Sequence, residues 1–273
     1  MHARLMLVVF SAGLFGAACG HSKSIPIMKD KIQAAHRVAV VGFSMSNQIS
    51  GSANQDRSSS GITGIVNSVK DTKQALSGDD ARRDEQEAKE GLQVLVTEME
   101  KRFGWEILPP EALARSESYS QRYQAKASNG MLDRGMRVPG VISYASAVEW
   151  LNKGAGPTLA RELGADAVIA FSIDLVPGAK DTKFAVSSGD KTVAGAFVKR
   201  PKAQISARTY DSAGTVIWSR QYVSGEPASK GIATNMGVEN RSQELEAFVE
   251  ATRAGWLALL KNYDAESGPV AAK

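Results

Sequence analysis

Two uninterrupted apolar segments of strand length constrain the fold of this 273-residue chain more than any other feature. One is RVAVVGF at 37–43, and the other is ADAVIAFSIDLV at 165–176. Continuous rather than alternating hydrophobicity is typical of strands that are buried on both faces, as in a sheet covered by helices on each side. The two segments therefore predict the core strands of an α/β fold.

Apolar residues at helical spacing occupy much of the sequence between these strands. They predict helices at 62–76 and 81–103, and the less periodic segment that follows is expected to hold one helix at 111–126. Ser146 and Glu149 have the spacing of a capping box, in which the serine oxygen accepts from a backbone N–H and the glutamate reaches back. This pattern predicts that a further helix begins at Ser146.

That helix is expected to break at Gly154–Gly156, to restart at Pro157 and to end at Gly164. Proline suits the first turn of a helix, and glycine readily adopts the left-handed conformation that ends one. The widest apolar stripe runs from Leu245 to Tyr263 and predicts a last helix that packs against a sheet.

Shorter β segments complete the predicted sheet, giving the order β-α-β-α-β-β-β-α with one optional extra hairpin. We expect one α/β (α+β) domain over 37–264, with a mixed sheet and helices packed on it. The shorter segments are a strand at 105–108, a hairpin of 202–210 and 215–223 across the turn Asp211–Gly214, and the optional hairpin of 182–188 and 191–199.

The composition is that of a globular protein, with 43% hydrophobic and 23% charged residues. The formal charge of +4 is spread along the chain, so no nucleic-acid partner is expected. Outside the domain we expect a tether at 19–36 and a disordered tail at 265–273. Within it, 44–90 is expected to hold a flexible polar insertion and a charged helix start.

The N-terminal 18 residues have the composition of an export signal. Arg4 precedes an apolar stretch at 5–15, and the small residues Gly16–Ala18 suit the cleft of a signal peptidase. Cys19, the only cysteine of the chain, follows directly. A lone cysteine forms no intramolecular disulfide, so this position indicates a site for lipid attachment.

The segment resembles a bacterial lipoprotein signal, in which the cysteine becomes the acylated first residue. The resemblance implies lipidation of Cys19 and anchoring in membrane lipid. Gly20 follows in place of the aspartate that is typical of inner-membrane retention, which implies the outer membrane, on its periplasmic side. The alternative is an ordinary secretory signal that is cleaved near Ala18.

The three histidines exclude several kinds of active site. His2 lies in the signal, His21 and His36 lie in the predicted tether, and the rest of the chain has none. A Ser-His-Asp triad, a histidine zinc site or a thiol nucleophile would need tether residues. We expect no catalytic residue, no cofactor and no metal site.

Carboxylates are the remaining candidates for catalysis. Asp166 and Asp174 flank the second core strand, where eight residues separate them by about 26 Å, too far for a catalytic pair. Asp166 is expected to cap the loop between helix and strand. Glu106, Glu149 and Asp211 are expected to serve the strand edge, the capping box and the turn.

Three further features each have a functional and a structural interpretation. Gly154–Thr158 precedes a helix start and could offer N–H groups to a phosphate, but it follows a helix, so we interpret it as a helix break. Tyr119, Tyr123 and Tyr144 could form a sugar-binding platform or pack against the sheet. The loop at 44–61 could be a binding lid or a plain disordered insertion.

Four segments in the same order resemble the periplasmic α/β domain of the CsgG-like curli-assembly lipoproteins and the related TolB N-terminal-like domains. They are RVAVVGF at 37–43, LVTEMEKRFGWEILP at 95–109, LARELGADAVIAFSI at 159–173 and YDSAGTVIWS at 210–219. The resemblance implies a non-enzymatic role in envelope assembly or interaction, with an envelope protein partner and a homo-oligomer as further expectations. The alternative is a sugar-binding or nucleotide-binding protein, or a carboxylate-dependent enzyme.

Overall fold

The computed structural model describes residues 25–47, 78–128, 136–178, 181–188, 191–234 and 241–266. The signal with Cys19, the predicted helix at 62–76, most of the loop at 44–61 and nearly all of the predicted tail lie outside these residues. The predicted α/β class is confirmed, with a mixed sheet and packed helices.

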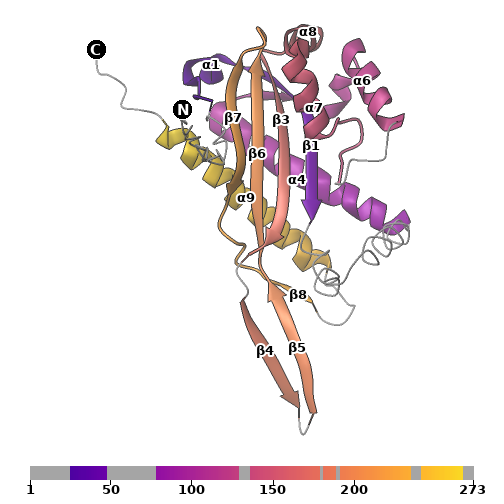
Figure 1. The fold of residues 1–273 in the computed structure, drawn as a ribbon, viewed down its shortest axis with the longest axis vertical. Coiled ribbons are helices and arrows are strands. Elements are labelled where there is room, and N and C mark those ends of the chain that lie inside the picture. The colour runs from indigo at the N-terminus through magenta and orange to yellow at the C-terminus, as the bar shows by residue number, and fades with distance from the viewer. Residues whose placement is uncertain are drawn as a thin grey trace, which may run out of the picture.

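A five-stranded sheet in the order β2-β1-β3-β6-β7 forms the centre of the fold (Figure 1). β1 runs parallel to β2 and β3, whereas β6 pairs antiparallel with β3 and β7. Both predicted core strands lie in its middle. The strands are β1 (Arg37–Asn47), β2 (Glu106–Leu108), β3 (Ala167–Pro177), β6 (Pro201–Asp211) and β7 (Val216–Ser224).

Helices pack on both faces of this sheet. The long helices α4 and α9 cover one face and contact each other, and they pass behind the strands in Figure 1. α7 and α8 cover part of the other face. The helices are α1 (Lys29–Ala34), α4 (Gly78–Phe103), α5 (Pro110–Leu113), α6 (Glu117–Ser128), α7 (Tyr144–Trp150), the π-helical turn η1 (Leu151–Ala155), α8 (Gly156–Leu163) and α9 (Arg241–Ala265).

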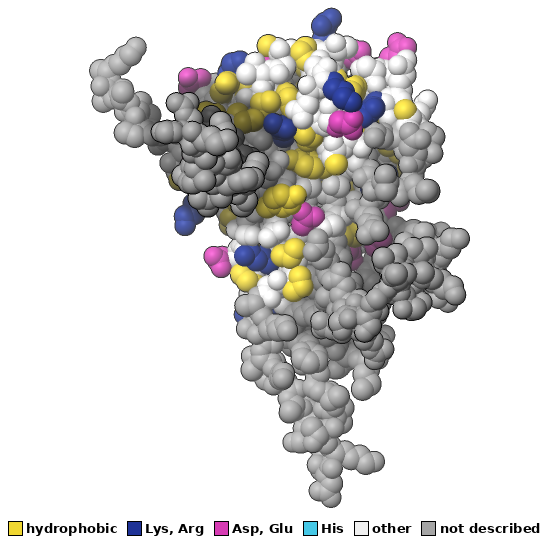
Figure 2. Space-filling view, in the orientation of Figure 1, with side chains coloured by type: hydrophobic (Ala, Val, Ile, Leu, Met, Phe, Trp, Pro, Cys, Tyr) yellow, Lys and Arg dark blue, Asp and Glu magenta, His cyan; other side chains and the backbone are white. Residues whose placement is uncertain are grey.

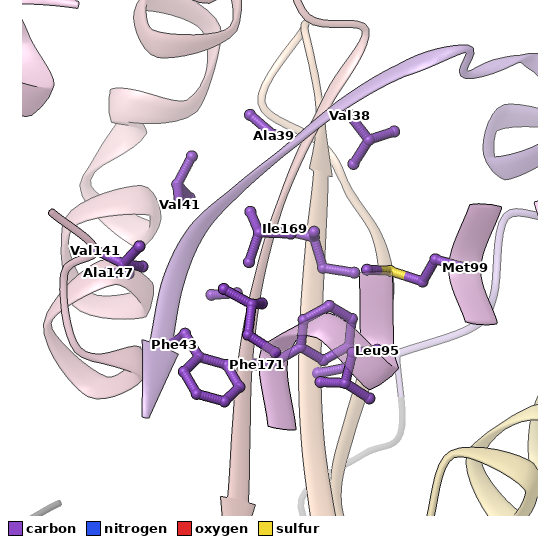
Figure 3. Close-up of a cluster of buried hydrophobic side chains, with 14 of the residues drawn as sticks. Val38, Ala39, Val41, Phe43, Leu95, Met99, Val141, Ala147, Ile169 and Phe171 are labelled. Atoms are coloured by element: carbon purple, nitrogen blue, oxygen red, sulfur yellow. The ribbon is translucent and has the colours of Figure 1, made fainter. Parts of the chain in front are cut away.

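The face under α4 and α9 holds the aromatic part of the core. Trp218 of β7 and Trp256 of α9 are fully buried, with ring centroids 6.2 Å apart. Figure 3 shows Leu95 and Met99 of α4 on the same side of the sheet as Phe171, which is also fully buried. The predicted last helix is confirmed, because its apolar stripe builds this layer.

A second, three-stranded sheet continues the central one away from the helices (Figure 1). β4 (Asp181–Ser188) and β5 (Lys191–Lys199) form the predicted extra hairpin, and the Gly178 N–H donates to the Arg200 carbonyl at 2.8 Å to link it to β3 and β6. β8 (Ile232–Thr234) pairs with β5. β8 is not among the strands that the sequence predicts.

The predicted glycine stops are confirmed. Gly164 ends α8 with a φ of 60°, and Gly154 interrupts the helix with a φ of 88° inside η1. The prediction of a capping box at Ser146 is wrong. The helix begins at Tyr144, two residues early, so Ser146 lies buried inside α7 and Glu149 pairs with Lys153 at 2.8 Å. The chain enters α7 directly from a bridge to β1 at Ile142, which sets the earlier start.

Three predicted boundaries also change. The helix expected at 111–126 is two helices, because Ser116 accepts from the Tyr119 N–H at 3.1 Å and caps α6 separately. The predicted tether is too long, since α1 packs Ile32 into the core with no exposed surface. Residues 44–47 of the predicted insertion extend β1 by pairing with β3.

Candidate binding cleft on the open half of the sheet

The two core strands change character at the same row of the sheet. Phe43 pairs with Phe171, and one residue further Ser44 pairs with Ser172. Up to this row both faces are apolar. Beyond it β3 alternates buried and half-buried residues to Val176, because helices cover one face only.

α7 sets where this change occurs. A Cβ built on Gly42 would lie 2.3 Å from the Cβ of Ala147 on α7 and 3.0 Å from that of Ala170 on β3. The helix therefore sits almost directly on the strands at this row. Side chains alternate along a strand, so Ser44, two residues after Gly42, points to the same face as α7 but beyond its first turn.

Polar side chains line the floor of this open half. Ser44, Ser172 and Ser206 occupy one row across β1, β3 and β6 by strand register. In the next row Ser46 donates to Asp174 Oδ1 at 2.6 Å. Hydroxyl groups both donate and accept hydrogen bonds, so the floor offers mixed donors and acceptors.

A β-bulge in β7 forms the far wall. Ile205 pairs with Val223 and Ala207 with Arg220, so two residues, 221 and 222, face Ser206. The Tyr222 N–H donates to Ser206 Oγ at 3.0 Å, and the residue has a φ of 52°, a left-handed conformation unusual for tyrosine. Its side chain is 64% exposed.

These residues enclose a cleft of about 260 Å³. Ser143 and Tyr144 at the start of α7, together with Arg137 and Gln221, complete its walls. Figure 2 views the molecule from this side, and its visible charges are scattered rather than gathered into one patch. Among the described residues, the lining holds one carboxylate, that of Asp174, and one guanidinium, that of Arg137.

Two wall residues are electrostatically unusual. Ser143 is only 4% exposed, and its Oγ has no hydrogen-bond partner among the described residues. A buried polar atom without a partner is costly, by about 1–3 kcal/mol. Burial raises the pKa of Tyr144 to about 12, and the Arg208 guanidinium only partly opposes this shift. The Tyr144 hydroxyl is thus a neutral donor at physiological pH.

Of the two aspartates flanking the second core strand, only Asp174 reaches the cleft. Asp166 lies at the other end of β3 and accepts from the backbone N–H groups of Arg37 at 2.9 Å and His36 at 2.8 Å. These bonds lower the pKa of Asp166. The Asp166 carboxylate therefore caps the start of β1 and not, as predicted, the loop between helix and strand.

The other acidic residues have structural partners. Glu106 lies 3.5 Å from Arg37 at the sheet edge, and Asp211 accepts from the Thr215 N–H at 2.7 Å in the predicted turn. Burial would raise the pKa of Asp211, but hydrogen bonds from Lys31 and the turn outweigh it and hold the pKa below its usual value. Among the described residues no group of three or more His, Cys, Asp or Glu could hold a metal ion.

The tyrosine platform does not assemble. Tyr119 is buried, donates to the Val41 carbonyl at 3.1 Å and accepts from the Ile142 N–H at 2.9 Å, so it packs against the sheet. The Tyr123 hydroxyl accepts from the Gly140 N–H at 3.2 Å. Only Tyr144 reaches the cleft.

The glycine-rich helix start is occupied by packing. A Cβ on Gly156 would lie 3.7 Å from the Tyr210 Cβ, and one on Gly214 would lie 2.9 Å from Pro157 Cγ. The hairpin turn of β6 and β7 therefore lies against this end of α8. The interpretation as a helix break is consistent with this contact.

The comparisons with known proteins leave the family open. No family model and no curated protein matches the chain. A crystal structure of lipoprotein GNA1162 from Neisseria meningitidis is similar at a TM-score of 0.31 and 14% identity, over 85% of this chain and 99% of that one. A likeness this weak carries no argument about function, and the resemblance to CsgG-like and TolB N-terminal-like domains stays a prediction. In the part of the chain that the structure describes, no helix is long and apolar enough to span a membrane.

Proposed function

We propose that this protein is a lipoprotein of the outer membrane that faces the periplasm and has a non-enzymatic role in envelope assembly or interaction. The observation that carries the proposal is Cys19 at the end of an export signal. A thiol at this position, acylated, would hold the chain on a membrane, since each buried CH₂ contributes about 0.8 kcal/mol.

The start of the domain supports close anchoring. Arg220 donates to the Ile25 carbonyl at 3.0 Å, and the Met28 N–H donates to the Ile217 carbonyl at 2.9 Å. Ile25 comes six positions after Cys19, a stretch that spans at most about 22 Å when fully extended. The side of the domain formed by α1 and β7 would therefore lie next to the membrane.

Binding rather than catalysis is supported by the chemistry of the cleft. Asp174 is the carboxylate that the described residues place in the lining, while hydrolysis of a glycosidic bond commonly uses a pair. His36, the histidine within the described residues, is exposed at the start of β1. A CsgG-like or TolB N-terminal-like domain that acts through a protein partner fits these features.

Membrane fractionation of the full-length protein in a didermic host tests the anchor. Cys19→Ser should release the protein from membranes after a high-salt wash, whereas the wild type stays bound. Gly20→Asp keeps the cysteine and should move the protein from the outer to the inner membrane. A Cys19→Ser protein that remains membrane-bound would refute the anchor.

A homo-oligomer is a separate expectation. Mass photometry of the detergent-solubilised protein should then show one discrete multiple of the monomer mass. Co-purification from the same extract would identify an envelope partner. A monomer without a co-purifying protein would count against the assembly role but leave the anchor intact.

A further inference from the structure

We infer that the cleft on the open half of the sheet binds one neutral sugar ring or a similarly small polyhydroxyl ligand. This inference goes beyond the proposed envelope role and does not depend on the lipid anchor. It is carried by the cleft's size, its hydroxyl groups, its balanced charge and the exposed aromatic ring at its wall.

Size limits the ligand. A volume of about 260 Å³ equals that of roughly nine water molecules in the liquid. Sites for drug-sized ligands commonly begin at about 300 Å³. A single sugar ring fits this space, whereas a nucleotide with its base, ribose and phosphates would extend beyond it.

The hydroxyl groups match a polyhydroxyl ligand. Ser44, Ser172 and Ser206 line the floor, and each hydroxyl can donate one hydrogen bond and accept others. Sugar hydroxyls have the same dual capacity. Ser143 also belongs to the wall, but its Oγ is buried away from solvent and offers no accessible hydroxyl to a ligand there.

The charges favour a neutral ligand over an anion. Among the described residues, Arg137 and Asp174 are the charged residues of the lining, one of each sign. Asp174 already accepts from Ser46 at Oδ1, and its second oxygen can accept from a ligand hydroxyl. A phosphate would meet the Asp174 carboxylate within the same small cleft, which disfavours it.

Tyr222 supplies a flat apolar surface. Its ring is the large exposed side chain of the cleft, and its backbone is held at a φ of 52° by the bulge. Bulges re-aim side chains, and strained backbone positions concentrate at ligand clamps. A sugar ring has C–H groups on its face and hydroxyls on its rim, so it can stack on Tyr222 while its rim reaches the serines.

The test is isothermal titration of the full-length protein in a detergent that has no sugar headgroup. The probes are D-glucose, D-galactose and N-acetyl-D-glucosamine, with inorganic phosphate, AMP and glycine for comparison. Saturable binding is expected for at least one sugar, and weaker or no binding for the comparison compounds. Binding of none of the sugars, or tighter binding of phosphate, AMP or glycine, would overturn the inference.

Variants locate the binding. Tyr222→Gly removes the ring and suits the left-handed backbone, so it should keep the fold and weaken sugar binding at least about tenfold. Asp174→Asn should also weaken binding, because the amide keeps only one acceptor oxygen. Leu257→Ala, at an exposed residue of α9 on the opposite face, is the matched control and should bind like the wild type. Unchanged binding by Tyr222→Gly would place the ligand elsewhere.

Discussion

The two faces of the central sheet differ in kind at neighbouring residues of one strand. Phe171 points into the core under α4 and α9 and has no exposed surface, while Ser172 points into the half-open cleft. The first face is covered along its whole length by two helices of 26 and 25 residues. The second is covered only as far as α7. We infer that the face under α4 and α9 stabilises the fold, whereas the face beyond α7 leaves polar groups accessible.

Truncation on either side of β3 should give the largest contrast. Phe171→Ala removes a fully buried aromatic ring and should lower the free energy of unfolding by about 3–5 kcal/mol. Ser172→Ala should change it by less than about 0.5 kcal/mol, because the hydroxyl faces the cleft. Urea denaturation measures both. Similar losses for the two variants would mean that the cleft is part of the core.

Alanine substitutions at Gly42, which faces α7, and at Gly91, which lies on α4, compare how closely helices pack on the two faces. Gly42→Ala places a methyl group 2.3 Å from the Ala147 Cβ, which cannot rotate away, so it should cost about 1–3 kcal/mol. Gly91→Ala on α4 meets the end of the flexible Met45 side chain at 3.0 Å and gains helix propensity. Its effect should lie within about 1 kcal/mol of zero.

Urea denaturation also measures the free energies of unfolding of Gly42→Ala and Gly91→Ala. The prediction requires Gly42→Ala to be the less stable protein. A larger loss for Gly91→Ala would contradict the close seating of α7 on β1. Ala147→Gly should partly restore the Gly42→Ala protein, since it removes the methyl group that the new Cβ meets.

Tyr222→Gly should separate stability from binding. A non-glycine residue in the left-handed region carries a conformational cost of about 1–2 kcal/mol. The variant should therefore have an unchanged free energy of unfolding or one that is higher by up to about 1 kcal/mol. Tyr222→Asn should behave similarly, because asparagine tolerates this region. A clear loss of stability in both variants would show that the ring supports the fold.

Much of the fold followed from local pattern, and the cleft did not. The change from Phe43 to Ser44 and from Phe171 to Ser172 is visible in the sequence as a switch from continuous to alternating apolar residues. Its meaning depends on strand register, because only pairing of β1 with β3 brings the two switches into one row. Local spacing alone holds no such information.

Other parts of the site depend on contacts that sequence spacing does not contain. The bulge at Tyr222 arises from how β7 pairs with β6, and the unpartnered Ser143 Oγ depends on the packing around α7. The capping box failed for a related reason. Its Ser–Glu spacing was present, but the bridge at Ile142 set the helix start earlier.

A pH dependence should be the smallest effect. The unfolded chain releases the Tyr144 proton near the usual pKa of 10, whereas burial raises the pKa in the folded chain to about 12. Arg208 opposes this shift, and Tyr222 and Tyr210 add to it. Stability from this group is therefore complete below pH 10 and is lost as pH rises toward 12.

At pH 10.5 the loss from Tyr144 should be below about 1 kcal/mol. Tyr144→Phe removes this ionisation while keeping the ring. Urea denaturation at pH 9 and pH 10.5 should show a smaller drop for the variant than for the wild type. Equal drops would mean that Tyr144 titrates alike in both states.

Chemical-shift mapping by nuclear magnetic resonance tests the central claim most directly, since it asks which face of the sheet a sugar touches. Titration of the labelled full-length protein with the best-binding sugar should shift the amides of Ser44, Ser206 and Tyr222. The amides of α9 around Leu257 should stay unchanged. Shifts centred on α9, or spread evenly over both faces, would contradict the division of the sheet into a structural face and a binding face.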